Sequence, residues 1–227
     1  RRGGPGRGGP SRGGGGGRER LSPKERRKQR EGFGRLYVDK QIREKTDMVF
    51  VTYDGDVQGV ISKRLCYDFD ILADGEKERL NKLPIKYMYK SKDVDLVKGH
   101  MGADDSVVGK ALPPIKARLE RFQIDTRHLA FARQNDKAIR ITLRGGEVFT
   151  GTVDWYSHFE VKLTLDPDDE GSVVVFRHAA LVFEVVGIAL DDIPIQGPRG
   201  RGGRPGGRPG GGRPGGRPGG GRPSGGP

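Results

Sequence analysis

Cysteine is almost absent from this chain, and long apolar runs are missing altogether. Cys66 is the only cysteine among 227 residues, which excludes an intrachain disulfide and fits a reducing compartment. No apolar run approaches the ~18 residues that a membrane-spanning helix needs. We therefore expect a cytoplasmic protein with no membrane partner.

Residue patterns suited to catalysis or metal binding are equally scarce. None of the four histidines forms a pair at metal-ligand spacing; they are His100, His128, His158 and His178. The Gly-rich stretches lack the flanking strand, helix and lysine of a phosphate-binding loop. Asp68 and Asp70 fall on one face of an expected strand, where a solvated pair is the better interpretation, and Cys66 is interpreted as packing. We predict a non-enzymatic protein without a metal or other cofactor.

Apolar residues make up only 33% of the chain, while glycine is abundant and unevenly placed. Of 39 glycines, 10 lie in residues 1–18 and 16 in residues 196–227. Residues 1–31 carry a net charge of +8 and residues 196–227 one of +7, so the net +12 leaves −3 for the middle. Segments of this composition cannot bury enough apolar surface to offset chain entropy. We predict disordered basic arms at 1–31 and 191–227.

Arginine recurs in the C-terminal arm between glycine and proline, with no acidic residue nearby. Such segments resemble RGG-type tails, which contact RNA through charge and guanidinium stacking. The alternatives are a solubilising tether, or an arm for an acidic protein or membrane surface. Both arms lack aromatic residues, so we expect non-specific nucleic-acid binding by seven arginines: Arg199, Arg201, Arg204, Arg208, Arg213, Arg217 and Arg222.

The middle of the chain contains one pattern twice, at residues 47–71 and 138–163. Each copy has a β-rich run, a tight Gly turn, a second run that crosses a glycine, and an aromatic residue eight positions later. These residues are Gly59 and Tyr67 in the first copy, and Gly151 and Phe159 in the second. Each copy closes with an aromatic–basic pair, Tyr89-Lys90 or Phe176-Arg177. Repetition of a whole unit predicts two copies of one folding module.

Alternating apolar residues predict five short strands in each copy. The first copy has them at 48–53, 57–66, 67–72, 83–89 and 94–97, with a polar loop at 73–82. The second has them at 139–144, 148–156, 159–165, 172–178 and 181–186. Short helices are expected near 36–42 and 125–134, the latter capped by Asp125 or Thr126. A long second strand that crosses a glycine favours a strongly bent barrel.

The predicted fold is therefore mainly β, with two tandem five-stranded bent barrels that each follow a short helix. The first domain is expected at residues 32–100 and the second at 118–190. The linker at 101–117 contains turn formers and a double proline. A core of about 65 residues is small, so packing two modules together, or closing a ring of them, would stabilise each one.

The second module resembles bacterial Hfq of the Sm-like superfamily, over roughly residues 118–187. Its late motif Phe176-Arg177-His178-Ala179 matches the Tyr-Lys-His-Ala motif of Hfq, and Phe159 matches the aromatic that stacks on uridine. The first module matches less well, with Tyr67 at the stacking position and Tyr89-Lys90-Ser91-Lys92 at the motif. The chain is thus similar to a tandem Hfq-like protein of the bacterial cytoplasm.

This resemblance implies single-stranded, U-rich RNA as the partner. Six Hfq modules form a ring in which the fourth strand of one pairs with the fifth of the next, so three tandem chains would close a similar homo-oligomer. The implied RNA-binding residues are Phe159, Arg177 and His178, with His158 alongside, and Tyr67, Tyr89 and Lys90 in the first module. Arg133 is the sole counterpart of the rim arginines. The implied function is that of an RNA chaperone or post-transcriptional regulator.

Several departures from Hfq favour a second hypothesis. Ser91 replaces the motif histidine in the first module, and the glutamine that helps to read uridine has no clear equivalent. Thr142 and Val51 stand where the face that binds A-rich RNA has an aromatic residue. From the residues alone, Phe159 and Phe176 would be core and Arg177 a solvated strand residue. The barrels would then serve as a protein-interaction scaffold or assembly factor, with the arms as a non-specific tether.

Overall fold

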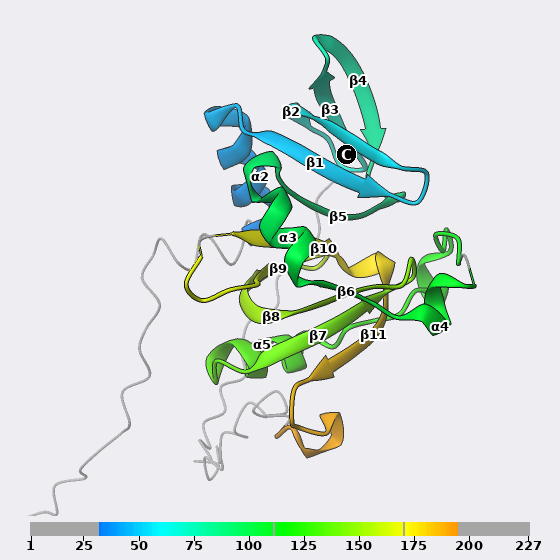
Figure 1. The fold of residues 1–227 in the computed structure, drawn as a ribbon, viewed down its shortest axis with the longest axis vertical. Coiled ribbons are helices and arrows are strands. Elements are labelled where there is room, and N and C mark those ends of the chain that lie inside the picture. The colour runs from blue at the N-terminus through cyan, green and yellow to red at the C-terminus, as the bar shows by residue number, and fades with distance from the viewer. Residues whose placement is uncertain (1–31, 111, 170, 195–227) are drawn as a thin grey trace, which may run out of the picture. The chain divides into compact units, whose positions relative to one another are not determined.

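The computed structural model describes residues 32–194 except 111 and 170. Eleven antiparallel strands form one sheet, which confirms the mainly β prediction (Figure 1). The predicted arm at 1–31, most of the arm at 191–227 and all seven tail arginines lie outside the described residues. Of the helices within the described range, none is long and apolar enough to cross a membrane.

The first half of the sheet comprises five strands in the order β5-β1-β2-β3-β4. They span β1 Asp47–Thr52, β2 Asp56–Arg64, β3 Asp68–Ala73, β4 Glu76–Asn81 and β5 Ile85–Lys90. Strand β1 is apolar on both faces, and its last five residues are buried because both faces are covered. Strand β2 has a register shift between Ile61 and Lys63, where a bulged strand bends. Gly59 lies close by, against the Leu72 carbonyl, and its role as the bend stays a prediction.

The second half repeats this order as β11-β7-β8-β9-β10. Its strands are β7 Ala138–Leu143, β8 Glu147–Tyr156, β9 Glu160–Thr164, β10 Ser172–Phe176 and β11 Ala180–Val185. Strand β8 bends like β2, with Gly151 against the Thr164 carbonyl and a register shift between Val153 and Trp155. A short strand, β6 (Met101–Ala103), adds to β8. Each half therefore places its fifth strand beside its first.

The two halves join through antiparallel pairing of β5 with β10, centred on Val174 opposite Met88. The expectation of two separate five-stranded barrels was wrong in this respect, because the described strands form one unclosed sheet. The described residues as far as Ile193 also belong to one compact unit. The exact bounds proposed for the two modules and the linker stay a prediction.

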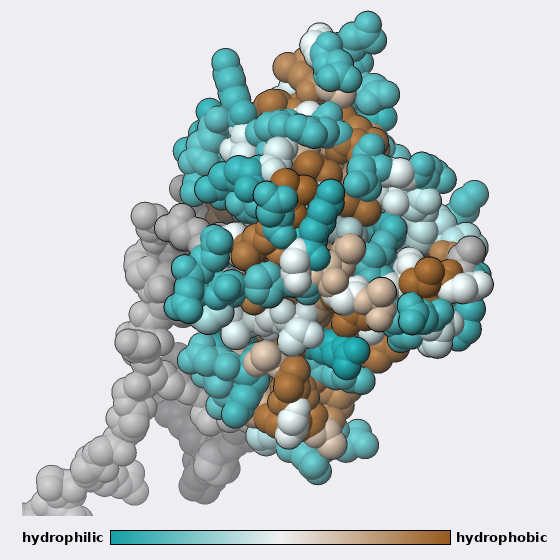
Figure 2. Space-filling model, viewed as in Figure 1, coloured by the Kyte–Doolittle hydropathy of each residue, from teal (hydrophilic) through white to brown (hydrophobic). Residues whose placement is uncertain are grey.

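Each half completes the hydrophobic core of the other. Val174 and Phe176 of β10 are buried in the cluster that contains Met48 and Phe50 of the first half. Tyr87 and Tyr89 of β5 are buried in the cluster of the second half. Hydrophilic side chains predominate on the outside, and apolar ones form smaller groups between them (Figure 2).

Four α-helices accompany the sheet in the described range: α2 Phe33–Glu44, α3 Val94–His100, α4 Asp105–Val108 and α5 Thr126–Gln134. Helices α2 and α5 confirm the two expected helices. Asp125 is the cap of α5, and its carboxylate accepts a hydrogen bond from the Arg127 amide. Helix α2 packs on both β2 and β8, so it bridges the two halves.

Two expectations for the first half were wrong. The polar stretch 73–82 is not a loop, because Asp74 and Gly75 both have positive φ and form a tight hairpin between β3 and β4. Residues 94–97 are helical rather than extended. Val94 and Val97 lie three residues apart, on one face of a helix, and Val97 is fully buried.

Candidate functional site

Phe159 occupies a short loop between β8 and β9 that strong backbone hydrogen bonds define. The Ser157 amide donates to the Glu160 carbonyl at 2.8 Å, and the Arg177 amide donates to the Phe159 carbonyl at 2.8 Å. These bonds close the loop and attach it to the end of β10. As a result the ring of Phe159 projects outward, 64% exposed.

Tyr67 occupies the equivalent loop of the first half, between β2 and β3. The Leu65 amide donates to the Asp68 carbonyl at 3.0 Å, and the Lys82 amide donates to the Tyr67 carbonyl at 2.9 Å. The pattern is the same as around Phe159, and Tyr67 is 79% exposed. The structure therefore places the two predicted stacking residues at matching positions, both open to solvent.

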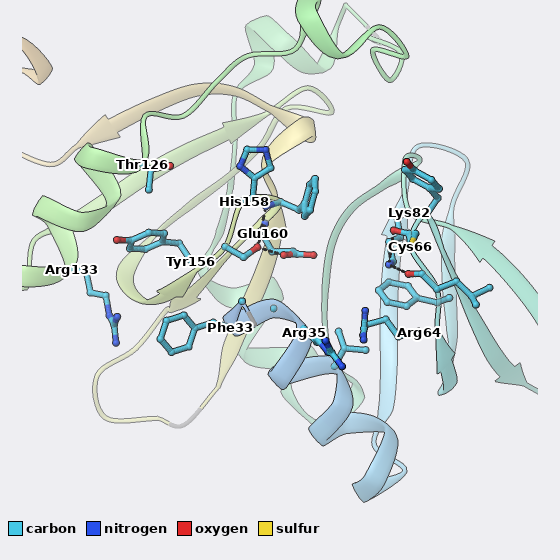
Figure 3. A pocket seen from close by; sticks show the side chains of 18 residues that line it. Phe33, Arg35, Arg64, Cys66, Lys82, Thr126, Arg133, Tyr156, His158 and Glu160 are labelled. Atoms are coloured by element: carbon cyan, nitrogen blue, oxygen red, sulfur yellow. Dashed lines mark hydrogen bonds between the residues drawn. The ribbon is translucent and has the colours of Figure 1, made fainter. Parts of the chain in front are cut away.

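Both aromatic residues line a single cavity of about 830 Å³ between the two halves of the sheet (Figure 3). The β8–β9 loop forms one wall and the β2–β3 loop forms the other. The N-terminal turn of α2, from Phe33 to Arg35, lies along the cavity. The sequence repeat could not predict that the two loops share one cavity, because this depends on the pairing of β5 with β10.

Basic side chains are spread around this cavity: Arg35, Arg64, Lys82, Arg133 and His158. Arg133 reaches it from α5 and lies over the ring of Phe33, 5.5 Å from the ring centroid. Arg64 pairs with Asp39 of α2 at 3.2 Å. His158 is exposed, packs edge-on against Phe159 at 5.0 Å, and lies 3.4 Å from the guanidinium of Arg118.

Lys82 is a residue of the site that sequence comparison missed. Its ammonium donates to the carbonyls of Leu65 and Cys66, at 2.5 and 3.2 Å, and lies 4.5 Å above the ring of Phe69. Burial lowers the pKa of Lys82, while the nearby Glu160 carboxylate acts in the opposite direction. Lys82 follows the fourth strand of the first half, as Arg177 follows the fourth strand of the second.

Tyr89 and Lys90, which the resemblance aligned with the late motif, lie elsewhere. They are in β5, the fifth strand, where Tyr89 is buried and Lys90 pairs with Met48. The misalignment arose because β4 was taken for a loop, which shifted the strand count by one. The Asp74-Gly75 turn was the signal that would have located Lys82.

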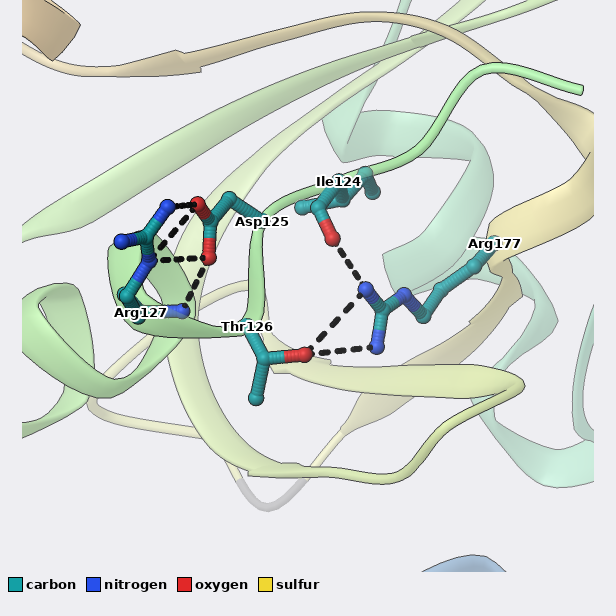
Figure 4. Close-up of polar contacts among 5 residues, drawn as sticks. All are labelled: Ile124, Asp125, Thr126, Arg127 and Arg177. Atoms are coloured by element: carbon teal, nitrogen blue, oxygen red, sulfur yellow. Dashed lines mark hydrogen bonds and ion pairs between the residues drawn. The ribbon is translucent and has the colours of Figure 1, made fainter. Parts of the chain in front are cut away.

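Arg177 is buried and is not among the residues that line the cavity. Figure 4 shows its guanidinium directed at Ile124 and Thr126. Its guanidinium donates to the carbonyls of Ile124 and Ser157 and lies 3.4 Å from the hydroxyl of Thr126. These bonds tie the segment before α5 to the Phe159 loop. Burial lowers the pKa of Arg177 from its usual value, against the pull of Asp125 and Glu160. Arg177 therefore positions the Phe159 loop, and its contact with RNA stays a prediction.

His178 connects the second half of the sheet to the first. Its Nε2 lies 3.0 Å from the Ile85 carbonyl, across the boundary between the two halves. Burial, together with the charge of Arg121, lowers the pKa of His178 to about 4. The imidazole is therefore neutral at pH 7, with Nε2–H as the donor. His178 therefore forms a hydrogen bond between the two halves and lacks the positive charge that would attract phosphate.

Glu160 is the first residue of β9 and the only acid among the described residues that line the cavity. Its Oε2 accepts a hydrogen bond from the Ser157 hydroxyl. Burial raises the pKa of Glu160, and the positive charges of Lys82, Arg177 and Arg64 partly counteract this rise. Nothing in the sequence pattern had singled out this residue.

No cluster of metal-ligating side chains occurs in the described part of the chain. The groups that the cavity offers to a ligand are therefore aromatic surfaces for stacking, positive charges and one carboxylate. In the comparisons with known proteins, no family model, curated protein or solved structure matches this chain. The cavity itself is thus the basis for an inference about function.

Proposed function

We propose that this chain binds single-stranded RNA in the cavity between its two halves. One observation carries the proposal: two highly exposed aromatic rings, Tyr67 and Phe159, occupy equivalent loops and line one cavity together with basic side chains. A single exposed ring is ordinary, but two that line one cavity are typical of a binding site. Unpaired bases stack on such rings, and each stacked base contributes about 1–3 kcal/mol.

The cations around the rings suit the RNA backbone. Arg35 and Arg133 are exposed and lie at the cavity, so they are the residues that we assign to phosphate groups. Such contacts add a salt-dependent term to affinity without reading sequence. The seven tail arginines would add a further non-specific term and raise the capture rate.

The strand arrangement supports an Hfq-like mode of action. Both halves have the order fifth, first, second, third and fourth strand, and β10 pairs with β5. This is a fourth strand beside a fifth, the pairing that the resemblance implies between neighbouring modules of a ring. We therefore propose an RNA chaperone or post-transcriptional regulator, acting without catalysis in the cytoplasm on small RNA or messenger RNA.

The same pairing suggests a homo-oligomer. Within the described residues, β4 pairs with β3 alone and β11 pairs with β7 alone. These outer edges are a fourth and a fifth strand, so β4 of one copy could pair with β11 of the next, and three copies could close a ring. Light scattering at micromolar concentration would give the mass of a trimer; a monomer would contradict this arrangement.

RNA binding is tested on the full chain by fluorescence anisotropy with labelled U6 and A6 at several salt concentrations. The variant with both Tyr67→Ala and Phe159→Ala should bind U6 at least tenfold more weakly, because two stacked bases are lost. Phe122→Ala is the matched control, since Phe122 is 39% exposed and lies outside the cavity lining.

A second full-length variant, with the seven tail arginines replaced by serine, separates the cavity from the arm. It should bind U6 less tightly and with a shallower salt dependence, but keep the difference between the parent and the double aromatic variant. If the arginine replacement abolishes binding and the aromatic replacement has no effect, the arm alone binds RNA.

That outcome would favour the protein-interaction scaffold. One observation points in its direction: Leu119 is 98% exposed and Phe122 is 39% exposed, in the segment before α5. Apolar side chains of this kind suit a protein partner. Leu119→Ser would then be compared with the parent chain in a co-purification assay, where it should retain less of the protein partner.

A further inference from the structure

A carboxylate inside a site for a polyanion requires an explanation. Glu160 begins β9, directly after Phe159, and lines the cavity, where its charge repels phosphate. A site that bound only the RNA backbone would be better without it. A carboxylate does have one use next to a stacked base, because it accepts hydrogen bonds from the N–H groups of the base edge.

The local structure fixes this carboxylate in one orientation. The Ser157 oxygen accepts hydrogen bonds from the amides of Phe159 and Glu160, both at 3.0 Å, and its hydroxyl donates to Oε2 of Glu160. On the other side lies Gly34 of α2, where a Cβ atom would collide with the same oxygen. Oε2 is therefore engaged and packed, so the carboxylate cannot swing freely.

Among the described residues, Oε1 of Glu160 is left for a ligand. It accepts no hydrogen bond from them. It is also not one of their buried polar atoms that lack a partner, so it is accessible to a ligand. Figure 3 shows the carboxylate pointing from the β9 side into the space that faces Arg64 and Lys82. The cavity thus presents one fixed acceptor, with two cations across from it and the two exposed rings among the same lining residues.

The four bases differ in what they offer to such an acceptor. Uracil and guanine have a ring N–H on the Watson–Crick edge, beside a carbonyl oxygen. This imide-type proton is more acidic than the exocyclic amino protons, so it forms a stronger hydrogen bond with a carboxylate. Cytosine and adenine have a ring nitrogen at the same position, and its lone pair would face the carboxylate oxygen.

We propose that Glu160 determines base specificity, by accepting the ring N–H of a uracil or guanine that is stacked on Phe159 or Tyr67. Lys82 and Arg64 lie on the opposite wall, where a cation favours the carbonyl oxygen beside that N–H. The inference depends on the proposed RNA binding and adds to it the residue that selects the base. The same carboxylate would disfavour C-rich and A-rich segments.

The first test needs no variant. The full chain is titrated with U6, with C6 and with a U6 in which every base is N3-methyluridine, which lacks the ring N–H. We expect U6 to bind at least fivefold more tightly than C6 and than the methylated oligonucleotide, because one charge-assisted hydrogen bond is lost in each. Equal binding of U6 and its methylated form would overturn the proposal.

The second test uses Glu160→Gln, which keeps the size of the side chain and an acceptor for Ser157. Its amide can also donate to the ring nitrogen of cytosine, so the ratio of U6 to C6 affinity should fall below twofold. Glu184→Gln removes the same charge from an exposed position on β11 and should leave the ratio unchanged. A ratio that stays at the parental value in Glu160→Gln also overturns the proposal.

These outcomes distinguish a failure of RNA binding from a failure of base selection. If no oligonucleotide binds, RNA binding and base selection both fail. If binding depends on Tyr67 and Phe159 but does not distinguish U6 from C6, RNA binding stands and the role of Glu160 is rejected. Circular dichroism of each variant confirms that the fold persists.

Discussion

At the residue scale, the late motif of the second half connects separate segments of the chain by hydrogen bonds. Arg177 is only 8% exposed and bonds to two segments of the chain, at Ile124–Thr126 and at Ser157. His178 bonds to the backbone of the other half. A buried cation with its hydrogen bonds satisfied holds a loop at a defined position. The motif therefore supports the Phe159 loop from behind, and Phe159 and Glu160 face the cavity.

His178 makes stability dependent on pH. Its pKa falls from 6.5 to about 4 in the folded protein, so the unfolded chain binds the extra proton between these values. Stability should therefore decrease as the pH falls from 6.5 towards 4, and the loss between pH 7 and pH 5 should be about 2 kcal/mol. Urea unfolding at both pH values measures it.

His178→Gln is the control for this effect, because glutamine keeps an N–H donor for the Ile85 carbonyl but does not titrate. Its free energy of unfolding should change less between pH 7 and pH 5 than that of the parent, by roughly the same 2 kcal/mol. An identical pH dependence in both proteins would show that His178 is not the group responsible.

At the scale of elements, the repeat predicted the sheet well where glycine and apolar residues set the geometry. Gly59 and Gly151 let β2 and β8 lie close against a carbonyl of the neighbouring strand, and each strand has a register shift a few residues later. Strand β4 was missed because its sequence EKERLN is charged and exposed, as befits an edge strand. The burial of Arg177 could not be predicted, because it depends on the distant segment before α5.

The bend in β8 yields a prediction with a matched control. Gly151→Ala should destabilise the protein by about 1–3 kcal/mol, because the new Cβ would collide with the Thr164 carbonyl, a backbone atom that cannot move aside. Gly99→Ala is the same change in α3, where nothing lies within 4 Å of the new atom. It should be neutral or stabilise by up to about 1 kcal/mol.

Chemical denaturation of the two variants measures both effects. If the two substitutions change the free energy of unfolding in opposite directions, the destabilisation at Gly151 comes from the close approach of the strands and not from the loss of a glycine. A destabilisation of similar size at both positions would contradict this explanation.

At the scale of the whole molecule, the two sequence repeats share their cores. Val174 and Phe176 belong to the second repeat in sequence but to the cluster of the first half in space, and Tyr87 shows the reverse. The β5–β10 pairing joins both into one sheet. A cavity between the two loops exists only while this junction is intact, so binding and folding depend on the same contacts.

We therefore expect the two halves to unfold in a single transition. Phe176→Ala removes a ring that is 1% exposed at the junction, and should destabilise the protein by about 3–5 kcal/mol. Phe176 lies in β10 but packs into the first half. Amide hydrogen exchange should therefore accelerate by a similar factor in β3, which is remote from Phe176 in sequence, and in β7, which is remote from it in space.

Trp155, the only tryptophan, packs into the cluster of the first half and reports on the junction by fluorescence. Its transition should coincide with that of the far-ultraviolet circular dichroism. Two separate transitions, or faster exchange in one half alone, would mean that the repeats fold independently, and the cavity could then open by separation of the halves.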